Sequence, residues 1–324
     1  MAELPKVAVV VLNWNGTDDT IECLESLAQL DYPNAEIVLV DNGSEPPAAA
    51  ALGARFPQVT CIQLDENTGY AGGNNVGIRY ALEHGHQYVW VLNNDTVVQP
   101  DSLRLAVETA LTDARIGVVG VKILAMEDPT RVWVAYGQVT YRQSLVRLIG
   151  YFWKDDGRFD EQCDVEWVPG TAMLLSRAAV ERLGGFDEEF FAYHEDVDWC
   201  TGARQAGFRI VFEPKSIIYH KGHRSSGGRV YVSPRQYLAG RNMVLFVRKR
   251  ANPLQALKFT AFVLATLPAQ YLRRLASGEQ QGVVLKVRGM LDGLRGRPLP
   301  LAELGLRPGG TKGATRFGKE GGDE

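Results

Sequence analysis

The sequence is poor in cysteine and lacks the signals of a secreted or membrane-spanning protein. Its 324 residues include four cysteines, which lie far apart and form no Cys-x-x-Cys pair. This spacing indicates neither a disulfide framework nor a zinc knuckle, so we expect a reduced, cytoplasmic setting. Residues 1–6 lack the charged-then-apolar layout of a signal peptide. The apolar stretch 259–269 is too short to span a bilayer, and Pro268 interrupts it.

Acidic residues are scarce in the C-terminal part of the chain. Residues 241–319 contain 15 lysines and arginines against three acids, although the whole chain has a net charge of -3. The basic segment is therefore expected to meet an anionic partner, either nucleic acid or a membrane surface. We expect no nucleic acid, because no pattern of aromatic residues accompanies the charge. Residues 308–324 are rich in Gly, Lys and Glu and are expected to be a disordered tail.

Short apolar segments alternate with amphipathic segments in the first half of the chain. The expected strands are residues 6–12, 36–40, 60–64, 88–92 and 117–123, and the expected helices are 17–30, 46–56, 78–83 and 100–114. This alternation predicts an α/β fold in which helices flank a doubly wound, mostly parallel sheet. Ligands of such sheets bind beyond the carboxyl ends of the strands. We expect one domain over residues 1–240, followed by a basic amphipathic helical extension over 241–307.

The second half of the chain is less regular. Residues 125–165 have no clear period and many aromatic residues, which favours a β-hairpin or an irregular insertion on the acceptor side. Further strands are expected at 167–175, 208–212 and 216–219, helices at 176–183 and 195–205, and helical structure beyond Tyr237. The aromatic residues of 133–153 are candidates to stack on sugar rings, with packing in the core as the alternative.

Polar clusters follow three of the expected strands, at residues 13–16, 41–44 and 93–95. A carboxylate such as Asp41 can accept from the N3–H of a uracil or thymine ring, but Asp-Asn-Gly is also a common turn sequence. Asp95 suits a divalent cation bound to a diphosphate, because such a cation needs only one or two protein carboxylates. The alternative for Asp95 is a capping role.

A Gly-rich stretch occupies residues 69–75. It predicts a loop whose backbone can approach a phosphate or a sugar, or a loop that caps a helix through Asn74 or Asn75. The stretch does not match Gly-x-Gly-x-x-Gly after the first strand, which argues against a dinucleotide-binding fold.

Three carboxylates crowd into four positions, at Glu195, Asp196 and Asp198. Crowded acids shift one another's proton affinity, so one of them can act as a base near neutral pH. The alternative is a solvated, acidic helix start. His220 ends a later strand, where a neutral imidazole can bind a metal or serve the structure, and His223 competes for the same role.

Six motifs, taken in chain order over residues 5–250, resemble those of family 2 glycosyltransferases of the GT-A fold, and most of all the bacterial rhamnosyltransferase-like branch. The motifs are Val-Leu-Asn-Trp-Asn-Gly, Val-Asp-Asn-Gly-Ser, Asn-Thr-Gly-Tyr-Ala-Gly-Gly-Asn-Asn-Val-Gly, Leu-Asn-Asn-Asp, Gly-Gly-Phe-Asp-Glu-x-Phe-Phe-x-Tyr-x-Glu-Asp-Val-Asp-Trp and Tyr-His-Lys-Gly. The resemblance implies that Asp196 is the catalytic base and that Asp41 contacts the nucleotide base. It also implies that Asp95 is the last Asp of an Asp-x-Asp metal motif, although Asn93 replaces the first.

The resemblance implies an inverting glycosyltransferase that moves a sugar from a nucleoside-diphosphate sugar, with dTDP-rhamnose favoured. The acceptor is expected to be a hydroxyl of a cell-surface glycan or of a lipid-linked acceptor, and Mg²⁺ or Mn²⁺ the cofactor. The implied donor-binding residues are Asn13, Asn15, Asp41, Gly73, Asn74 and Asn94. The implied metal ligands are Asp95 and His220, and the acceptor side holds Glu195, Asp198 and Trp199.

Other interpretations remain open at this point. A sugar nucleotidyltransferase is one, although residues 13–19 are acidic where such enzymes carry a basic loop. A non-catalytic nucleotide-sugar-binding or scaffold module of a polysaccharide assembly complex is another. The segment 241–297 is expected to rest on the inner face of the cytoplasmic membrane, with basic residues beside its apolar stretch, or else to form a packed helix pair.

Overall fold

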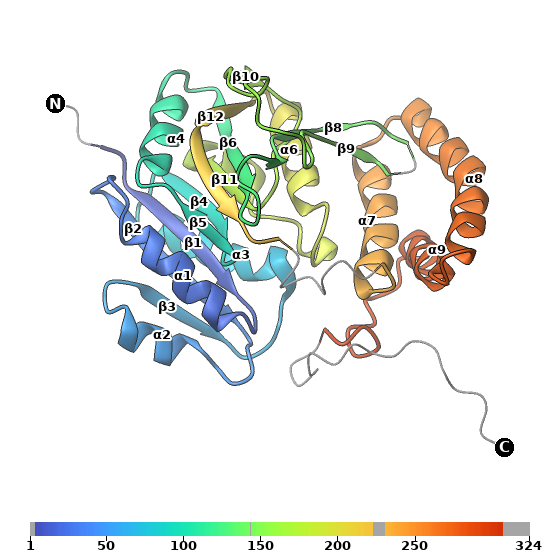
Figure 1. Ribbon diagram of the computed structural model, residues 1–324, viewed down its shortest axis with the longest axis horizontal. Helices are drawn as coiled ribbons and strands as arrows, with labels where there is room; N and C mark the ends of the chain where they lie inside the picture. The colour runs from blue at the N-terminus through green and yellow to red at the C-terminus, as the bar shows by residue number, and fades with distance from the viewer. Residues whose placement is uncertain (1–3, 143, 223–230, 307–324) are drawn as a thin grey trace.

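The computed structural model describes residues 4–142, 144–222 and 231–306, so the expected tail at 308–324 and the competing His223 lie outside the described residues. Its main sheet has the strand order β10-β12-β6-β11-β4-β1-β2-β3 (Figure 1). The parallel part consists of β1 (Val7–Asn13), β2 (Ala35–Asn42), β3 (Thr60–Leu64) and β4 (Tyr88–Asn93). Helices α1 (Thr17–Leu27), α2 (Ala49–Arg55) and α3 (Gly69–Glu83) connect these strands.

Strand β1 shows why the sheet is covered on both sides. Its alternate residues enter two different hydrophobic clusters. Ala8 and Val10 belong to one cluster, and Val7, Val9 and Val11 belong to the other. All five side chains are fully buried. A continuous apolar strand of this kind is stable only between two helical layers, as the sequence predicted.

The second half of the sheet mixes strand directions. Its elements are β5 (Thr96–Val98), α4 (Ser102–Leu111), β6 (Ile116–Ala125), β7 (Val132–Val134), β10 (Cys163–Asp164), β11 (Ala172–Ser176), α5 (Arg177–Leu183), α6 (Glu195–Gln205) and β12 (Arg209–His220). Strand β11 runs antiparallel to both of its neighbours. The expected hairpin forms from β8 (Tyr136–Val139) and β9 (Val146–Ile149).

Three of the expected strands were wrong in extent. The strand expected at 167–175 begins only at Ala172, because the chain at Gly170 turns its N–H toward Asp196. The strands expected at 208–212 and 216–219 are one strand, β12, whose register with β6 shifts between Glu213 and Ile217.

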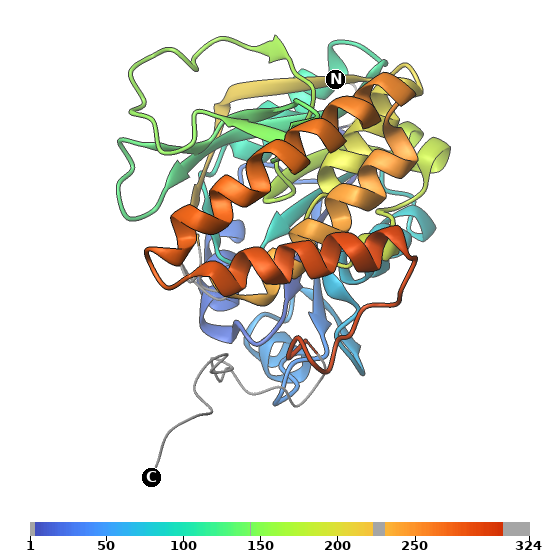
Figure 2. The same ribbon diagram turned by 90° about the vertical axis from the view of Figure 1, so that its right-hand side faces the viewer.

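Three helices follow the sheet: α7 (Pro234–Arg250), α8 (Pro253–Leu275) and α9 (Gln280–Leu294). The boundary expected at residue 240 falls inside α7, whose Met243 and Phe246 belong to a main hydrophobic core. Helix α9 packs closely on α7, since a Cβ on Gly240 would lie 2.1 Å from the backbone oxygen of Lys286. Helix α8 lies outermost (Figure 2), and Phe259 is its only buried residue.

Candidate functional site

Asn13, Asp41 and Asn94, three of the predicted donor-binding residues, meet at the carboxyl ends of β1, β2 and β4. The Asn13 amide nitrogen donates to Asp41 Oδ1 at 3.2 Å, and the Asn94 amide nitrogen donates to Asn13 Oδ1 at 3.3 Å. Asn15, next along the chain, accepts from the Glu45 N–H at 2.8 Å. The sequence therefore placed these residues correctly at one edge of the sheet.

The Asp41 carboxylate is fully buried and occupied by protein donors. It accepts from the Ser44 hydroxyl, from the Asn13 amide and, at 2.6 Å, from the Ala48 N–H. Buried carboxylates are stable when several donors satisfy them, so Asp41 shapes the ends of β1 and β2. Its contact with a nucleotide base stays a prediction.

The Gly-rich stretch 69–75 is not a loop, which corrects the sequence prediction. Helix α3 begins at Gly69, and Gly73 and Asn74 lie buried inside it. A Cβ on Gly73 would lie 2.4 Å from Leu12 Cδ1, so this glycine allows α3 to pack closely on β1. The Asn74 amide nitrogen donates to the backbone carbonyl of Tyr70, while the Asn74 Oδ1 is buried without a partner. Donor contact by Gly73 or Asn74 stays a prediction.

Asp95 and His220 come together from distant parts of the chain. His220 Nε2 lies 3.1 Å from Asp95 Oδ1, and both side chains are buried. Burial raises the pKa of Asp95, but the hydrogen bond and charge of His220 outweigh it and the net pKa is lowered. In the described part of the chain no group of three or more His, Cys, Asp or Glu residues could hold a metal.

Asp196 stands in the first turn of α6 and is partly exposed. Its Oδ2 accepts from the Gly170 N–H at 2.9 Å, and its Oδ1 accepts from the Val197 N–H. The Gly170 carbonyl in turn accepts from the Tyr70 hydroxyl. Two backbone donors thus fix the carboxylate in one orientation, which is what a positioned general base requires.

The neighbouring carboxyl, Glu195, has a different environment. Its side chain is buried, and Oε2 has no hydrogen-bond partner. Burial, and then the charge of Asp196, raise the pKa of Glu195 well above its usual range. Burial also raises the pKa of Asp196, although the N–H donors of Gly170 and Val197 oppose that rise. The pair therefore holds a proton on Glu195 and leaves Asp196 as a base of raised pKa.

Asp198 and Trp199, the other residues predicted on the acceptor side, are both buried and bound to protein groups, so their acceptor role stays a prediction. Asp198 is buried and accepts from Lys249 Nζ and from Arg250 Nε, each at 2.7 Å. Trp199 lies in the main core, where its indole N–H donates to the Gly184 carbonyl. Both residues join α6 to its surroundings.

The turn before Asp196 adopts an unusual backbone conformation. Phe191, Tyr193 and His194 have φ angles of 61°, 71° and 72°. The Asn242 side chain of α7 holds this turn by donating to the carbonyls of Phe190, Ala192 and Tyr193 at 2.7–2.8 Å. Positive φ in bulky residues persists only where the surroundings enforce it, and it is common at functional sites.

Sequence reasoning missed Tyr70, Gly170 and Asn242. Tyr70 lies near both Asp196 and Asp95. Burial raises the pKa of its hydroxyl well above the usual range, and the charges of Asp196 and Asp95 add to the rise. Its position inside the Gly-rich motif was a signal that could have identified it. Asn242 gave no such signal, because its partners lie about fifty residues away in the chain.

Of the aromatic residues proposed for sugar stacking, Trp133 lies nearest to the predicted metal ligands. Its ring centroid is 4.9 Å from that of His220, in an edge-on arrangement. Tyr151 packs against Trp133 at 5.8 Å and is 42% exposed. The cluster lies beside His220, and its stacking on a sugar ring stays a prediction.

A family model described as glycosyltransferase-like family 2 matches residues 5–239. The chain belongs to this family. It is an enzyme with a GT-A fold that transfers a sugar from a nucleotide-sugar donor. The sequence analysis is thereby confirmed for family, fold and class of reaction.

Three similar proteins illustrate the relationship. An N-acetylglucosaminyl-diphospho-decaprenol L-rhamnosyltransferase of Mycobacterium tuberculosis is 28% identical over 247 residues, covering 69% of this chain and 77% of its own length. A hexosyltransferase of low-salt glycan biosynthesis from Haloferax volcanii is 26% identical, covering 64% of each chain. A mannosyltransferase from Pyrobaculum calidifontis, solved with GDP-Man and Mn²⁺, shares the fold with a TM-score of 0.55, 19% identity and coverage of 90% and 88%.

Proposed function

We propose that this glycosyltransferase is an inverting rhamnosyltransferase that extends a lipid-linked acceptor. The orientation of Asp196 by Gly170, together with the contact between Asp95 and His220, carries the proposal. Asp196 removes the proton of an acceptor hydroxyl, and that oxygen bonds to the anomeric carbon. The bond from this carbon to the donor phosphate breaks, and the diphosphate leaves with its electron pair. In-line attack on the opposite face inverts the anomeric centre.

The donor sugar is proposed from the mycobacterial relative, which is named as an L-rhamnosyltransferase. Turnover of a panel of nucleotide sugars, measured as released nucleoside diphosphate, tests this proposal directly. We expect dTDP-rhamnose to give the highest kcat/KM, with UDP- and GDP-sugars at least about tenfold lower, a discrimination that a few specific contacts supply. A higher kcat/KM with a UDP- or GDP-sugar than with dTDP-rhamnose would contradict the assignment of rhamnose as the donor sugar.

We propose that Asp95 and His220 hold a divalent cation, Mg²⁺ or Mn²⁺. The Asp95 carboxylate oxygen suits both ions, and the His220 imidazole nitrogen suits a transition metal such as Mn²⁺ better than Mg²⁺. His220 Nδ1 is a buried atom without a partner. Two protein ligands suffice when diphosphate and water complete the shell. When bound, the cation would neutralise charge on the leaving diphosphate.

We expect chelation to abolish turnover and added Mg²⁺ or Mn²⁺ to restore it. Asp95→Asn should raise the metal concentration needed for half-maximal activity by about tenfold or more, since a carboxylate is the stronger ligand. Lys221 is a poor substitute for the cation, because it already pairs with Asp19 and Glu22. Full activity after exhaustive chelation would contradict the proposal.

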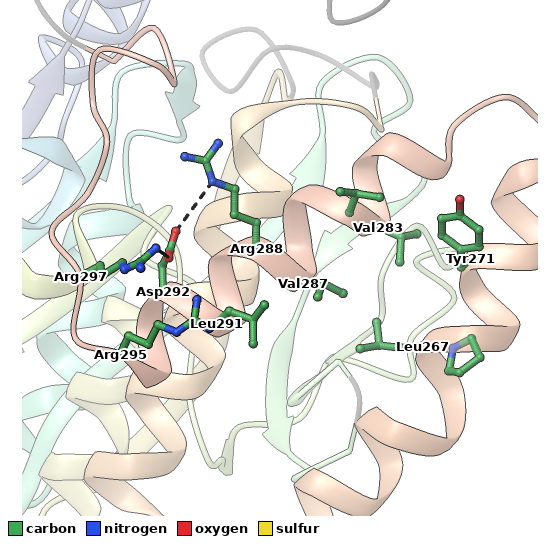
Figure 3. A pocket seen from close by; sticks show the side chains of 11 residues that line it. Leu267, Tyr271, Val283, Val287, Arg288, Leu291, Asp292, Arg295 and Arg297 are labelled. Carbon is green, nitrogen blue, oxygen red and sulfur yellow. Dashed lines mark hydrogen bonds and ion pairs between the residues drawn. The ribbon is translucent and has the colours of Figure 1, made fainter.

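We further propose that α8 rests on the cytoplasmic face of the membrane that carries the acceptor. Apolar side chains three, seven or eight positions apart form one exposed stripe on this helix. Its members are 50–75% exposed: Leu254, Leu257, Leu264, Leu272 and Leu275. Beside the stripe, α8 and α9 border a groove of about 470 Å³ (Figure 3), lined by Leu267 and Tyr271 on one side and Val287 and Leu291 on the other. No helix in the described ranges is long and apolar enough to cross a membrane.

The structure corrects the basic rim that the sequence suggested. Arg248 donates to the Gly293 carbonyl, Lys249 and Arg250 bind Asp198, and Arg274 binds Glu279. Arg273 keeps its charge free of any ion pair with a described residue. Apolar burial, rather than charge, therefore dominates the proposed docking, at about 1.5 kcal/mol or more per buried leucine.

Co-sedimentation with vesicles tests this docking. We expect the protein to bind phosphatidylglycerol vesicles more tightly than phosphatidylcholine vesicles, and a Leu264→Gln/Leu272→Gln variant to lose most binding to both. Leu111→Gln, on the exposed face of α4, is the matched control. A dimer in solution that the double variant converts to a monomer would show instead that a second copy covers this face.

A further inference from the structure

Lys286 is a buried cation that the mechanism does not use. It lies in the middle of α9, and only 8% of its surface is exposed. Within the described residues its ammonium makes no hydrogen bond and no ion pair, yet its nitrogen is not sealed from solvent. Burial alone lowers the pKa of Lys286 to about 8, with no carboxylate opposing the shift. An unpaired buried ammonium costs stability, which an arriving anion would recover.

Lys286 lies close enough to the turn before Asp196 for its charge to act on His194. Leu285, its neighbour in α9, packs against the same hydrophobic cluster as Tyr193. His194 follows directly and has a buried Nδ1 without a partner. Burial, and then the positive charges of Lys286 and Arg235, lower the pKa of His194 to about 4. Arg235 also stands over the Tyr193 ring, with 5.4 Å between its Cζ and the ring centroid.

Three nitrogen groups, those of His194, Arg235 and Lys286, therefore lie at or near the turn before α6, an 11-residue helix. The end of such a helix already favours negative charge. The turn lies two residues before Asp196 in the chain and is bound by Asn242 of α7, whereas Asp95 follows β4 and His220 ends β12. An anion held here would thus be bound by residues other than those of the proposed donor diphosphate site.

We propose that Lys286, Arg235 and His194 form a subsite for the phosphate that links the acceptor sugar to its lipid. This proposal rests on the proposed transfer to a lipid-linked acceptor, in which phosphate and reacting hydroxyl belong to the same small glycan. Binding the phosphate at this turn fixes the distance from its sugar to Asp196. The contact with the phosphate therefore also orients the acceptor hydroxyl toward Asp196.

The first test compares Lys286→Met with the wild-type enzyme on two acceptors, one sugar linked to a short prenyl chain through diphosphate and one carried by a neutral alkyl glycoside. We expect KM for the diphosphate acceptor to rise about tenfold, the loss of one charged hydrogen bond. KM for the donor, and kcat/KM for the neutral acceptor, should stay unchanged. Lys215→Met, on an exposed lysine, is the control. An equal loss with both acceptors would show a structural role, and a higher KM for the donor would assign Lys286 to the donor diphosphate.

The second test needs no turnover, and so separates this subsite from the proposed function. In thermal unfolding without donor or metal, geranyl diphosphate should raise the Tm of the wild-type protein and of Lys215→Met, but not of Lys286→Met. Inorganic pyrophosphate should act through the same residue, more weakly. If these shifts occur and no rhamnose is transferred to any acceptor, the subsite stands and the proposed function fails. Equal shifts in wild type and Lys286→Met would overturn the subsite.

Discussion

Asp196→Asn is expected to lower kcat by about 10²- to 10⁴-fold, the usual contribution of a general base. The amide keeps the shape of the carboxylate, and its oxygen can still accept from the Gly170 N–H, although its NH2 group cannot accept from the Val197 N–H. Donor affinity should change little, because Asp196 faces the acceptor hydroxyl in the proposed reaction. Steady-state kinetics and a donor-binding titration measure the two effects. A variant that keeps more than about a tenth of wild-type turnover would show that another group is the base.

The pH dependence of the wild-type enzyme provides a second measurement of the same group. Burial raises the pKa of Asp196, so kcat/KM should rise with pH through a value above the ordinary carboxyl range. Glu195 keeps its proton over that interval, since its pKa lies well above the usual range. Asp196→Asn should lose this rise, whereas the conservative change Glu195→Gln should keep it.

The raised pKa also predicts the sign of a stability effect. A group whose pKa is higher in the folded protein contributes stability below its unfolded-state pKa, and that contribution is lost as pH rises. At neutral pH the ionised Asp196 therefore destabilises the folded state, and the uncharged Asn removes this destabilisation. We expect Asp196→Asn to unfold at an equal or higher Tm than the wild type, the trade-off typical of active sites.

The parts of the site that the sequence predicted well are those encoded by local pattern. Strands β1 to β4 are continuous apolar segments, so their ends, with Asn13, Asp41 and Asp95, could be placed at one edge of the sheet. The pairing of Asp95 with His220 spans 125 positions, and the family resemblance predicted it. Periodicity alone does not contain such a contact.

The parts that the sequence did not predict depend on tertiary packing. Four glycines between residues 69 and 77 argue for a loop, because glycine disfavours helices. Close packing overrides that preference: a Cβ on Gly77 would lie 2.3 Å from Val10 Cγ1, so only glycine lets α3 approach β1. The partners of Asp198 and the clamp made by Asn242 lie on α7, whose place against α6 no local pattern reveals.

Asp198 gives the largest expected loss of stability. Its side chain is 4% exposed and is held by Lys249 and Arg250. Removing one partner of a buried ion pair leaves an uncompensated charge, which typically costs about 3–5 kcal/mol. Lys249 is 39% exposed and Arg250 is 18% exposed, so solvent recovers part of that cost. We expect Asp198→Asn to lower the free energy of unfolding by about 3 kcal/mol.

Urea unfolding of Asp198→Asn measures this loss, with Asp187→Asn as the matched control. Asp187 also binds Lys249, at 2.8 Å, but its side chain is 32% exposed, so its substitution should cost about 1 kcal/mol or less. Well below its Tm, Asp198→Asn should keep kcat within about threefold of wild type, because its carboxylate is bound by Lys249 and Arg250 of α7. The opposite pattern, normal stability with lost turnover, would show that Asp198 acts on the acceptor side of the site. Asp196 and Asp198 would then both take part in the reaction, and Asp198 would not have a purely stabilising role.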